Sequence, residues 1–382
     1  MKEDRRPKIV ADDRIPFLRG VLEPYADVAY LPGAKITRGD VADADAILTR
    51  TRTRCNAELL EGSRVRLIAT ATIGYDHIDT DWCGAHGIRW VNAPGCNSSS
   101  VQQYIVAVLV ALAKEQRRTL RKTTLGVIGA GNVGSKVAGA GAALGMNVLL
   151  NDPPRAAREG AAAFTPLGEL LARSDIVTCH TPLTKDGSCP TWHLSSDAFF
   201  RQMKTGAVYI NSSRGAVTDS EALKRAAQSK LSAFVLDVWE GEPAPDATLL
   251  AQSFVGTPHI AGYSSDGKVN GTAACIHELC RFFGLDILPD HYLAAVPPPP
   301  FPVAFTVDGS GKTPEEVFYE AVMHTYPVME DSRRLKQSPE TFEEQRGNYW
   351  NRREFGSYTL RPDGADADVV DGLRKLGFHI AP

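Results

Sequence analysis

Short apolar runs recur along the first part of the chain, separated by segments with a helical or polar pattern. Most runs are nearly continuous rather than alternating, which is typical of strands buried on both faces of a parallel sheet. Before residue 97 these runs are Lys8–Ala11, Ala46–Thr49, Leu67–Thr70 and Arg89–Asn92. The pattern predicts a parallel sheet with helices on both sides.

A second series of the same kind begins at Thr124. Its strands are expected at Leu125–Ile128, Asn147–Leu150, Ile176–Cys179, Ala207–Ile210 and Phe234–Asp237. Right-handed crossovers between such strands produce a doubly wound sheet. Between the two series, the polar run Asn97–Ser100 is a good helix start, and the aliphatic stretch behind it predicts a long helix buried between domains or subunits.

The pattern changes after Pro297–Pro300, which is typical of a stiff linker. A strand at Val303–Val307, a helix opening at Thr313 and a closing helix ending at Gly377 indicate a smaller α+β unit. The predicted fold class is therefore α/β, with two doubly wound, Rossmann-like or flavodoxin-like parallel-sheet domains and a small C-terminal α+β domain.

Composition and charge exclude several classes of protein. The net charge of the 382 residues is −3, which provides no positive field for nucleic acid or an acidic membrane. The longest apolar run, Ile105–Ala113, is far shorter than the roughly 20 residues that span a bilayer. The N-terminus is charged and does not resemble a signal peptide. Seven scattered cysteines without a C-x-x-C pair argue against a metal site and a disulfide framework, so we expect a cytoplasmic protein without a metal.

The loop from Gly129 to Gly134 has the spacing G-x-G-x-x-G, follows an apolar strand and opens a helix of small residues. In this context Gly129 permits a tight turn, Gly131 lets the backbone approach a pyrophosphate, and Gly134 lets helix and strand pack closely. Asp152 ends the next strand, where a carboxylate would bind ribose hydroxyls and repel a 2′-phosphate. NAD is therefore the expected cofactor, and Arg155 is expected on the solvated rim.

Three charged residues follow later strands of the same series, where open α/β sheets bind ligands. Arg214 can clamp a carboxylate with its planar fork. His259 can take a hydroxyl proton as hydride leaves the neighbouring carbon, and Glu242 can fix the tautomer of that imidazole. Each residue alone has an ordinary structural interpretation, but together they predict oxidation of a 2-hydroxy acid.

These motifs, with His180–Leu183, Asn211–Gly215, Asp237–Pro243 and Thr257–Gly262, resemble the D-isomer-specific 2-hydroxyacid dehydrogenase family. The resemblance implies that Arg214, Glu242 and His259 are the catalytic set. It also implies cofactor contacts, which would be Gly129, Gly131, Asn132, Val133, Gly134, Asp152, Thr181, Asp237 and Gly262.

The resemblance further implies the domain organisation. The substrate-binding domain would consist of residues 1–96 and 258–285, and the NAD-binding domain of residues 97–257. Residues 286–382 would form a C-terminal domain through which the chain makes a homodimer.

Several stretches, including Ala69–Asp79, Asp152–Arg155 and His259–Tyr263, resemble one vitamin B6-pathway branch of this family, whose substrate is a phosphorylated sugar acid. By that resemblance Thr51, Thr72, Gly74 and Tyr263 would contact the substrate. Arg50, Arg52 and Arg54 alternate along the chain, so an extended backbone would place them on one face, as a phosphate pocket or as a solvated strand end. We expect Arg50 and Arg52 to help bind the phosphate.

Two other functions fit the same residues. The chain could be a different enzyme of the family, such as one acting on 3-phosphoglycerate. It could also be an NAD-sensing regulator that kept the fold without useful turnover. The folded pattern after residue 300 and the absence of a basic or Pro-Ser-rich segment argue against the regulator.

Overall fold

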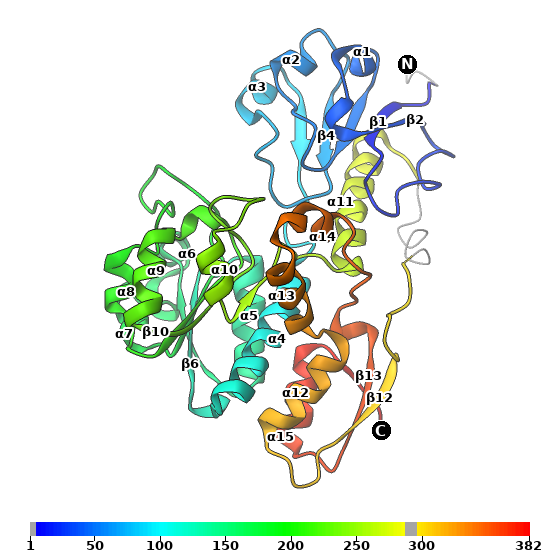
Figure 1. The fold of residues 1–382 in the computed structure, drawn as a ribbon. Helices are drawn as coiled ribbons and strands as arrows, with labels where there is room; N and C mark the ends of the chain where they lie inside the picture. The colour runs from blue at the N-terminus through cyan, green and yellow to red at the C-terminus, as the bar shows by residue number, and fades with distance from the viewer. Residues whose placement is uncertain (1–4, 287–295) are drawn as a thin grey trace. The chain divides into compact units, whose positions relative to one another are not determined.

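The computed structural model describes residues 5–286 and 296–382, and the chain divides into two compact units (Figure 1). The first unit consists of Met1–Asn97 and Ser264–Pro298, and the second of Ser98–Tyr263 and Pro299–Pro382. The chain enters the first unit again at Ser264, six residues after the expected 258. The loop carrying His259 stays with the second unit because Asp237 binds its backbone. The third domain is expected from residue 286, and residues 287–295 of it lie outside the described residues.

The first unit contains a parallel sheet of five strands in the order β2-β1-β3-β4-β5. The strands are β1 (Lys8–Asp12), β2 (Asp27–Leu31), β3 (Ala46–Thr49), β4 (Leu67–Thr70) and β5 (Arg89–Val91). Alternate side chains of β1, β3 and β4 enter two separate cores. One core contains α11 (Ser265–Phe283), and the other is closed by α1 (Arg38–Val41), α2 (Ala57–Leu60) and α3 (Thr80–Ala85). Both faces are covered, which explains the continuous apolar runs.

The second unit is built around a parallel sheet of six strands in the order β11-β10-β9-β8-β6-β7. The strands are β6 (Thr124–Ile128), β7 (Asn147–Asn151), β8 (Ile176–Cys179), β9 (Ala207–Asn211), β10 (Leu231–Leu236) and β11 (Val255–Gly256). The order reverses between β6 and β8, and such a switch point is where doubly wound sheets bind ligands.

Helices cover both faces of this sheet. One core contains residues of α4 (Ser98–Gln116) and α5 (Asn132–Ala143). The opposite core contains residues of α7 (Leu167–Arg173), α8 (Asp197–Gln202), α9 (Ser220–Ser229) and α10 (Ala247–Gln252), while α6 (Pro153–Glu159) follows β7. From Tyr104 to Leu112, α4 is buried within this unit, where it packs on α5 and α12 (Pro314–Thr325).

The C-terminal part of the second unit adds a small parallel sheet in the order β12-β13-β14 (Figure 1). Its strands are β12 (Ala304–Asp308), β13 (Thr359–Asp363) and β14 (His379–Ile380). Its further helices are α13 (Val328–Gln337), α14 (Phe342–Gly347) and α15 (Ala367–Leu376). Thr313 caps α12 as predicted, with Glu316 completing a capping box. Two parallel sheets and a small third one confirm the predicted fold class.

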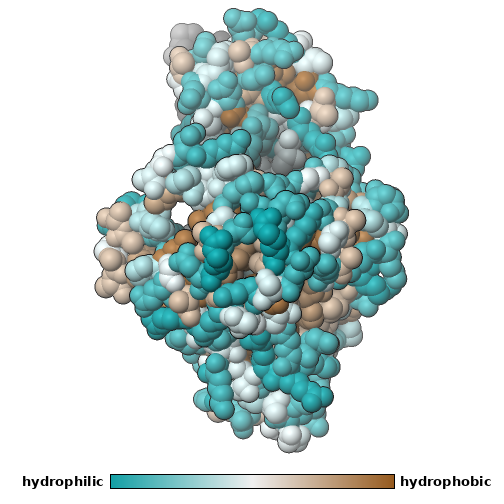
Figure 2. Space-filling view, turned by 60° about the vertical axis from the view of Figure 1, so that its left-hand side comes forward, coloured by the Kyte–Doolittle hydropathy of each residue, from teal (hydrophilic) through white to brown (hydrophobic). Residues whose placement is uncertain are grey.

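The surface is mostly hydrophilic, and its hydrophobic residues form small groups in the face that Figure 2 shows. Within the described residues, no helix has the length and apolar character needed to cross a membrane. All seven cysteines are free thiols.

Candidate active site

The carboxyl ends of the six strands in the second unit lie at one edge of the sheet. Register pairing brings together their last residues, which are Ile128, Asn151, Cys179, Asn211, Leu236 and Gly256. The glycine loop, Asp152, Thr181, Arg214, Asp237 and His259 all follow these ends within a few residues. The predicted cofactor and catalytic residues of this unit therefore come from one edge.

The glycine loop has the geometry that its three glycines predict. Gly129 has a φ of +84°, and a Cβ there would lie 2.7 Å from the carbonyl oxygen of His180. A Cβ on Gly134 would lie 1.8 Å from the carbonyl oxygen of Gly129, so helix and strand pack too closely for a side chain. Gly131, by contrast, faces open space. Helix α5 begins next, at Asn132 and Val133, without a side-chain cap, so its first amides can bind an anion.

Asp152 follows β7 and ties this strand to the glycine loop. Its Oδ2 accepts a hydrogen bond from the Ala130 amide at 2.9 Å, and its Oδ1 accepts one from the Arg155 amide at 2.9 Å. The Arg155 guanidinium pairs with Glu159 at 2.6 Å, with its side chain 31% exposed. The arginine is thus engaged by a neighbouring carboxylate at the rim.

The catalytic candidates His259 and Glu242 form a hydrogen-bonded pair. Nδ1 of His259 lies 2.8 Å from Oε2 of Glu242, and Oε1 of Glu242 accepts a hydrogen bond from the Trp239 amide at 2.9 Å. Burial acts to raise the pKa of Glu242. The hydrogen bond and charge of His259, the Trp239 amide and the charge of Arg346 outweigh it, so this pKa lies below its ordinary value. An ionised carboxylate therefore faces Nδ1, and Nε2 makes no hydrogen bond within the described residues.

Arg214 lies on the loop after β9, and this loop packs against the one that carries Glu242. The side chain of Asn211 organises it by donating to the Arg214 carbonyl at 2.9 Å and accepting from the Ser213 amide at 3.0 Å. A Cβ on Gly215 would lie 2.0 Å from the carbonyl oxygen of Trp239. Only glycine permits this approach, so the loops that carry Arg214 and Glu242 can pack closely.

Asp237 binds the backbone of the loop that carries His259. Its Oδ1 accepts hydrogen bonds from the Thr257 hydroxyl at 2.6 Å and the Ile260 amide at 2.8 Å, and its Oδ2 accepts one from the Ala261 amide at 2.9 Å. Burial raises the pKa of this carboxyl. The family resemblance assigns Asp237 to the cofactor, but the structure shows that both of its oxygens already bind the protein.

The substrate candidates of the first unit lie near the ends of β3 and β4. The Thr72 hydroxyl lies 2.7 Å from the hydroxyl of Thr70 and 2.9 Å from the carbonyl oxygen of Gly74. Thr51 is exposed one residue beyond Arg50. The structure therefore brings Thr72 and Gly74 into direct contact, with Thr51 on the neighbouring loop.

The three arginines after β3 do not continue the strand. β3 ends at Thr49, and residues 50–54 form a bend and irregular chain, so the extended arrangement on one strand face does not occur. Arg50 donates to the carbonyl oxygen of Arg14 at 3.1 Å, whereas Arg52 and Arg54 are exposed. The residues between these arginines are Thr51 and Thr53, which are polar. The segment therefore has no apolar face to pack a strand against the core.

A family model for the NAD-binding domain of D-isomer-specific 2-hydroxyacid dehydrogenases matches residues 100–261. A second model, for a domain of unknown function, matches residues 298–377. Erythronate-4-phosphate dehydrogenase of Bacteroides thetaiotaomicron is 47% identical over 355 residues, which cover 92% of this chain and 99% of the relative. The Shigella flexneri serotype 5b protein of that name is 38% identical and covers 97% and 98%.

The chain belongs to the erythronate-4-phosphate dehydrogenase family. It is an NAD-dependent oxidoreductase, and the resemblance found in its sequence is confirmed. D-lactate dehydrogenase of Aquifex aeolicus, crystallised with NAD and lactic acid, has a TM-score of 0.58 at 28% identity. It covers 72% of this chain and 95% of its own. D-mandelate dehydrogenase of Rhodotorula graminis, at 23% identity and a TM-score of 0.62, shares the fold.

The residues around the sheet edge fit NAD. The open space at Gly131 and the uncapped start of α5 suit a pyrophosphate. The Thr181 hydroxyl is buried and has no hydrogen-bond partner among the described residues, so it can bind a cofactor atom. Next to it, burial lowers the pKa of His180 to about 3, which keeps that imidazole neutral. Gly262 lies in the turn that follows His259.

Arg352, in the C-terminal part of the chain, contacts the loop that carries His259 and was not among the predicted site residues. Its side chain is fully buried, and Nη2 donates to the carbonyl oxygens of Ala261 at 2.5 Å and Ile260 at 3.4 Å. The guanidinium carbon lies 4.3 Å from the centre of the Tyr326 ring. No sequence pattern indicated this contact, because a lone arginine 93 positions after His259 has no periodic relation to it.

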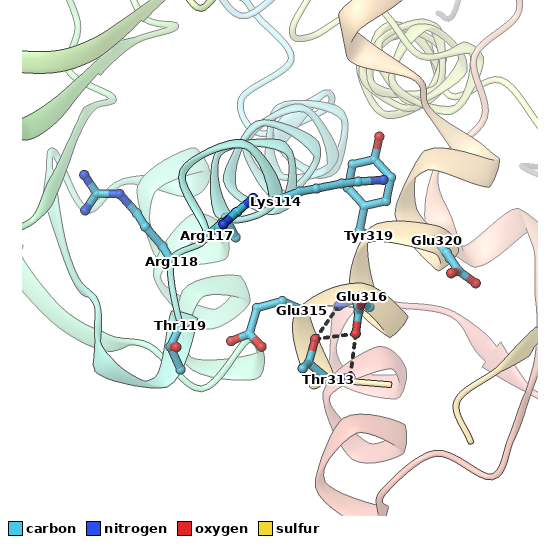
Figure 3. Close-up of a pocket in the computed structure, with 10 residues that line it drawn as sticks. Lys114, Arg117, Arg118, Thr119, Thr313, Glu315, Glu316, Tyr319 and Glu320 are labelled. Atoms are coloured by element: carbon cyan, nitrogen blue, oxygen red, sulfur yellow. Dashed lines mark hydrogen bonds between the residues drawn. The ribbon is translucent and has the colours of Figure 1, made fainter. Parts of the chain in front are cut away.

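A cavity of about 380 Å³ lies away from the site residues, between the end of α4 and the start of α12 (Figure 3). Its charged residues have both signs, with Lys114 placed 3.8 Å from the centre of the Tyr319 ring and Glu315 on the opposite helix. Tyr104, whose hydroxyl lies 2.9 Å from that of Thr257, is ten residues earlier on α4, about 15 Å along the axis. The cavity contains none of the predicted site residues.

Proposed function

We propose that the chain oxidises the C2 hydroxyl of 4-phospho-D-erythronate to give 2-oxo-3-hydroxy-4-phosphobutanoate, a step in the biosynthesis of pyridoxal 5′-phosphate (vitamin B6). The observation that carries this proposal is the pair of Glu242 and His259 beside the Arg214 loop, because it combines a proton acceptor with a carboxylate-binding group. The substrate named in both relatives, erythronate 4-phosphate, supports the choice of substrate.

His259 acts as the general base at Nε2, since Nδ1 faces the carboxylate of Glu242. As C2 loses a hydride, the hydroxyl proton passes to Nε2 and a C2=O bond forms. NAD accepts the hydride when it is bound. Arg214 binds the substrate carboxylate through its guanidinium and orients C2. The ionised Glu242 stabilises the imidazolium that results.

The remaining site residues divide between cofactor and substrate. Gly129, Gly131, Asn132, Val133, Gly134, Asp152, Thr181 and Gly262 bind NAD, and Asp237 supports the site by holding the His259 loop. The substrate residues are Thr51, Thr72, Gly74, Tyr263, Arg50 and Arg52. Thr72 and Gly74 are in contact, which supports their acting together.

A turnover assay with purified protein tests the proposal. NADH formation is followed at 340 nm, near neutral pH, with NAD and one of three acids: erythronate 4-phosphate, 3-phosphoglycerate or D-lactate. We expect kcat/KM to be highest for erythronate 4-phosphate by at least about 100-fold, because buried polar groups left unpaired by a wrong substrate cost that much. His259→Ala should abolish turnover while the protein still binds NAD.

The alternatives give different results in the same assay. Preference for 3-phosphoglycerate would show another enzyme of the family. NAD binding without turnover of any of the three acids would favour an NAD-sensing regulator. Near-normal turnover by the His259→Ala variant would contradict the mechanism, whichever acid reacts.

We also infer a homodimer formed through residues 286–382. Val303 and Met329 of this region are 45% and 38% exposed, which supports an apolar contact with a second copy. Light scattering of the full chain should give twice the monomer mass, and Val303→Glu with Met329→Glu should reduce it. The seven free thiols support a cytoplasmic location.

A further inference from the structure

Arg346 reaches the catalytic residues from the C-terminal part of the chain. It lies on α14, whose Phe342 is 1% exposed in the same core as residues that line the six-stranded sheet. The preceding helix is fastened to β11 by a hydrogen bond of 3.0 Å from the Gly256 amide to the Ser332 hydroxyl. The helix that carries Arg346 is therefore fixed next to the sheet that carries His259.

The guanidinium of Arg346 lies next to two residues of the site. Its carbon is 5.5 Å from the centre of the Tyr263 ring, close enough for a cation–π contact. Its positive charge also helps to lower the pKa of Glu242, the partner of His259. Arg346 is thus a second guanidinium beside the proposed reaction centre, in addition to Arg214.

Among the described residues, the counter-charges of Arg346 are a long ion pair with Glu343 and the nearby carboxylate of Glu242. Glu343 lies 3.8 Å from Nη1, and the side chain of this glutamate is 47% exposed. Nε of Arg346 is buried and has no hydrogen-bond partner in the described parts of the chain. A buried donor on a charged group is costly to leave unpaired. An anionic ligand would supply the missing acceptor.

We propose that Arg346 binds the phosphate of the substrate and so selects phosphorylated acids over unphosphorylated ones. This inference rests on the proposed function, because it requires a substrate with a second anionic group. Arg214 is assigned to the carboxylate, and Arg346 would add a cation for the phosphate to the proposed Arg50 and Arg52. The planar guanidinium of arginine suits phosphate oxygens, and the cation–π contact with the Tyr263 ring helps to position it.

The position of Arg346 in the chain supports a role in specificity. The 2-hydroxyacid dehydrogenase model ends at residue 261, whereas Arg346 lies within the separately matched segment 298–377. The Aquifex aeolicus enzyme crystallised with lactic acid covers only 72% of this chain while matching 95% of its own. Lactic acid carries no phosphate, so an enzyme that acts on it needs no such cation.

The test compares wild type with Arg346→Met, Arg346→Lys and the control Arg333→Met, on two acids with the same carbon chain, erythronate 4-phosphate and D-erythronate. Arg333 is an exposed arginine of α13 that pairs with Glu330. Arg346→Met should lower kcat/KM for the phosphorylated acid by roughly 10- to 100-fold and leave that for D-erythronate within about 3-fold. Arg346→Lys should lie between, and Arg333→Met should match wild type.

Calorimetric titration of the NAD-loaded proteins with inorganic phosphate provides a readout independent of turnover. Arg346→Met should weaken phosphate binding at least about 10-fold relative to Arg333→Met. Equal losses of kcat/KM for both acids, or equal phosphate binding by all variants, would overturn the role of Arg346. If wild type oxidises neither acid, the proposed function is wrong, and the titration still decides whether Arg346 binds phosphate.

Discussion

Replacing Asp237 with alanine removes three hydrogen bonds that hold the loop carrying His259. The acceptor is lost for the Thr257 hydroxyl and for the amides of Ile260 and Ala261, at 2.6, 2.8 and 2.9 Å. Each buried group left unpaired costs about 1–3 kcal/mol. The alanine variant also lacks the buried carboxylate, whose charge is disfavoured by burial, and this gain offsets part of the loss in stability. We therefore expect a net loss of about 3 kcal/mol in the free energy of unfolding.

For a unit of about 250 residues, that loss corresponds to a fall in Tm of roughly 6–12 °C. Urea unfolding followed by fluorescence measures the free energy, and steady-state kinetics measure the catalytic effect. We expect kcat to fall by roughly 100-fold because His259 is displaced, while KM for NAD changes little. The control is Asp246→Ala, which removes one N-cap hydrogen bond and a partly exposed ion pair with Lys224 and should cost about 1 kcal/mol. An Asp237→Ala protein with unchanged stability and kcat but a raised KM for NAD would refute this reasoning and favour the predicted cofactor role of Asp237.

Three further variants test other parts of the site. Glu242→Gln should lower kcat/KM by roughly 10- to 100-fold, because the lowered pKa of Glu242 keeps its carboxylate charged and the amide cannot stabilise the imidazolium that forms. Unchanged kcat/KM would contradict the proposed role of the pairing with His259. Arg352→Met should lower kcat by roughly 10- to 100-fold and leave KM for NAD within about 2-fold. The reason is that the carbonyls of Ile260 and Ala261 lose their hydrogen bonds to the guanidinium. Unchanged kcat would show that this arginine only supports the fold. Thr181→Val should raise the dissociation constant of NAD by about 5-fold in fluorescence titrations, through one lost hydrogen bond, and Thr184→Val, whose hydroxyl lies 3.2 Å from that of Thr191, should not.

The sheets could be predicted because burial on both faces leaves a continuous apolar run in the sequence. Where one face is exposed or a strand is short, that signal is lost. β2, at the edge of its sheet, alternates between exposed and half-buried residues and was not predicted. β13 contains Pro362, which argues against a central strand. The proline is tolerated because β14 pairs only with Thr359 and Leu360, so Pro362 lies beyond its end.

The catalytic candidates could be predicted because each follows the end of a strand, where parallel sheets place their ligands. Contacts between distant segments leave no such mark. The approach of Gly215 to Trp239 and the bonds from Arg352 to the loop after His259 depend on how loops fold over the sheet. The arginines after Thr49 show a different limit, since their alternation would place them on one face only if the backbone were extended, and the structure does not continue the strand there.

The backbone of His259 explains why its loop needs support from two sides. Its φ is +56°, a conformation that costs a non-glycine residue roughly 1 kcal/mol or more and persists only where the surroundings impose it. The amides after it bond to the carboxylate of Asp237, and the carbonyls of Ile260 and Ala261 bond to Arg352. A negative group thus takes the donors of the loop and a positive group takes its acceptors. The second group comes from the segment matched by the domain of unknown function, so the sheet edge alone does not hold the His259 imidazole in place.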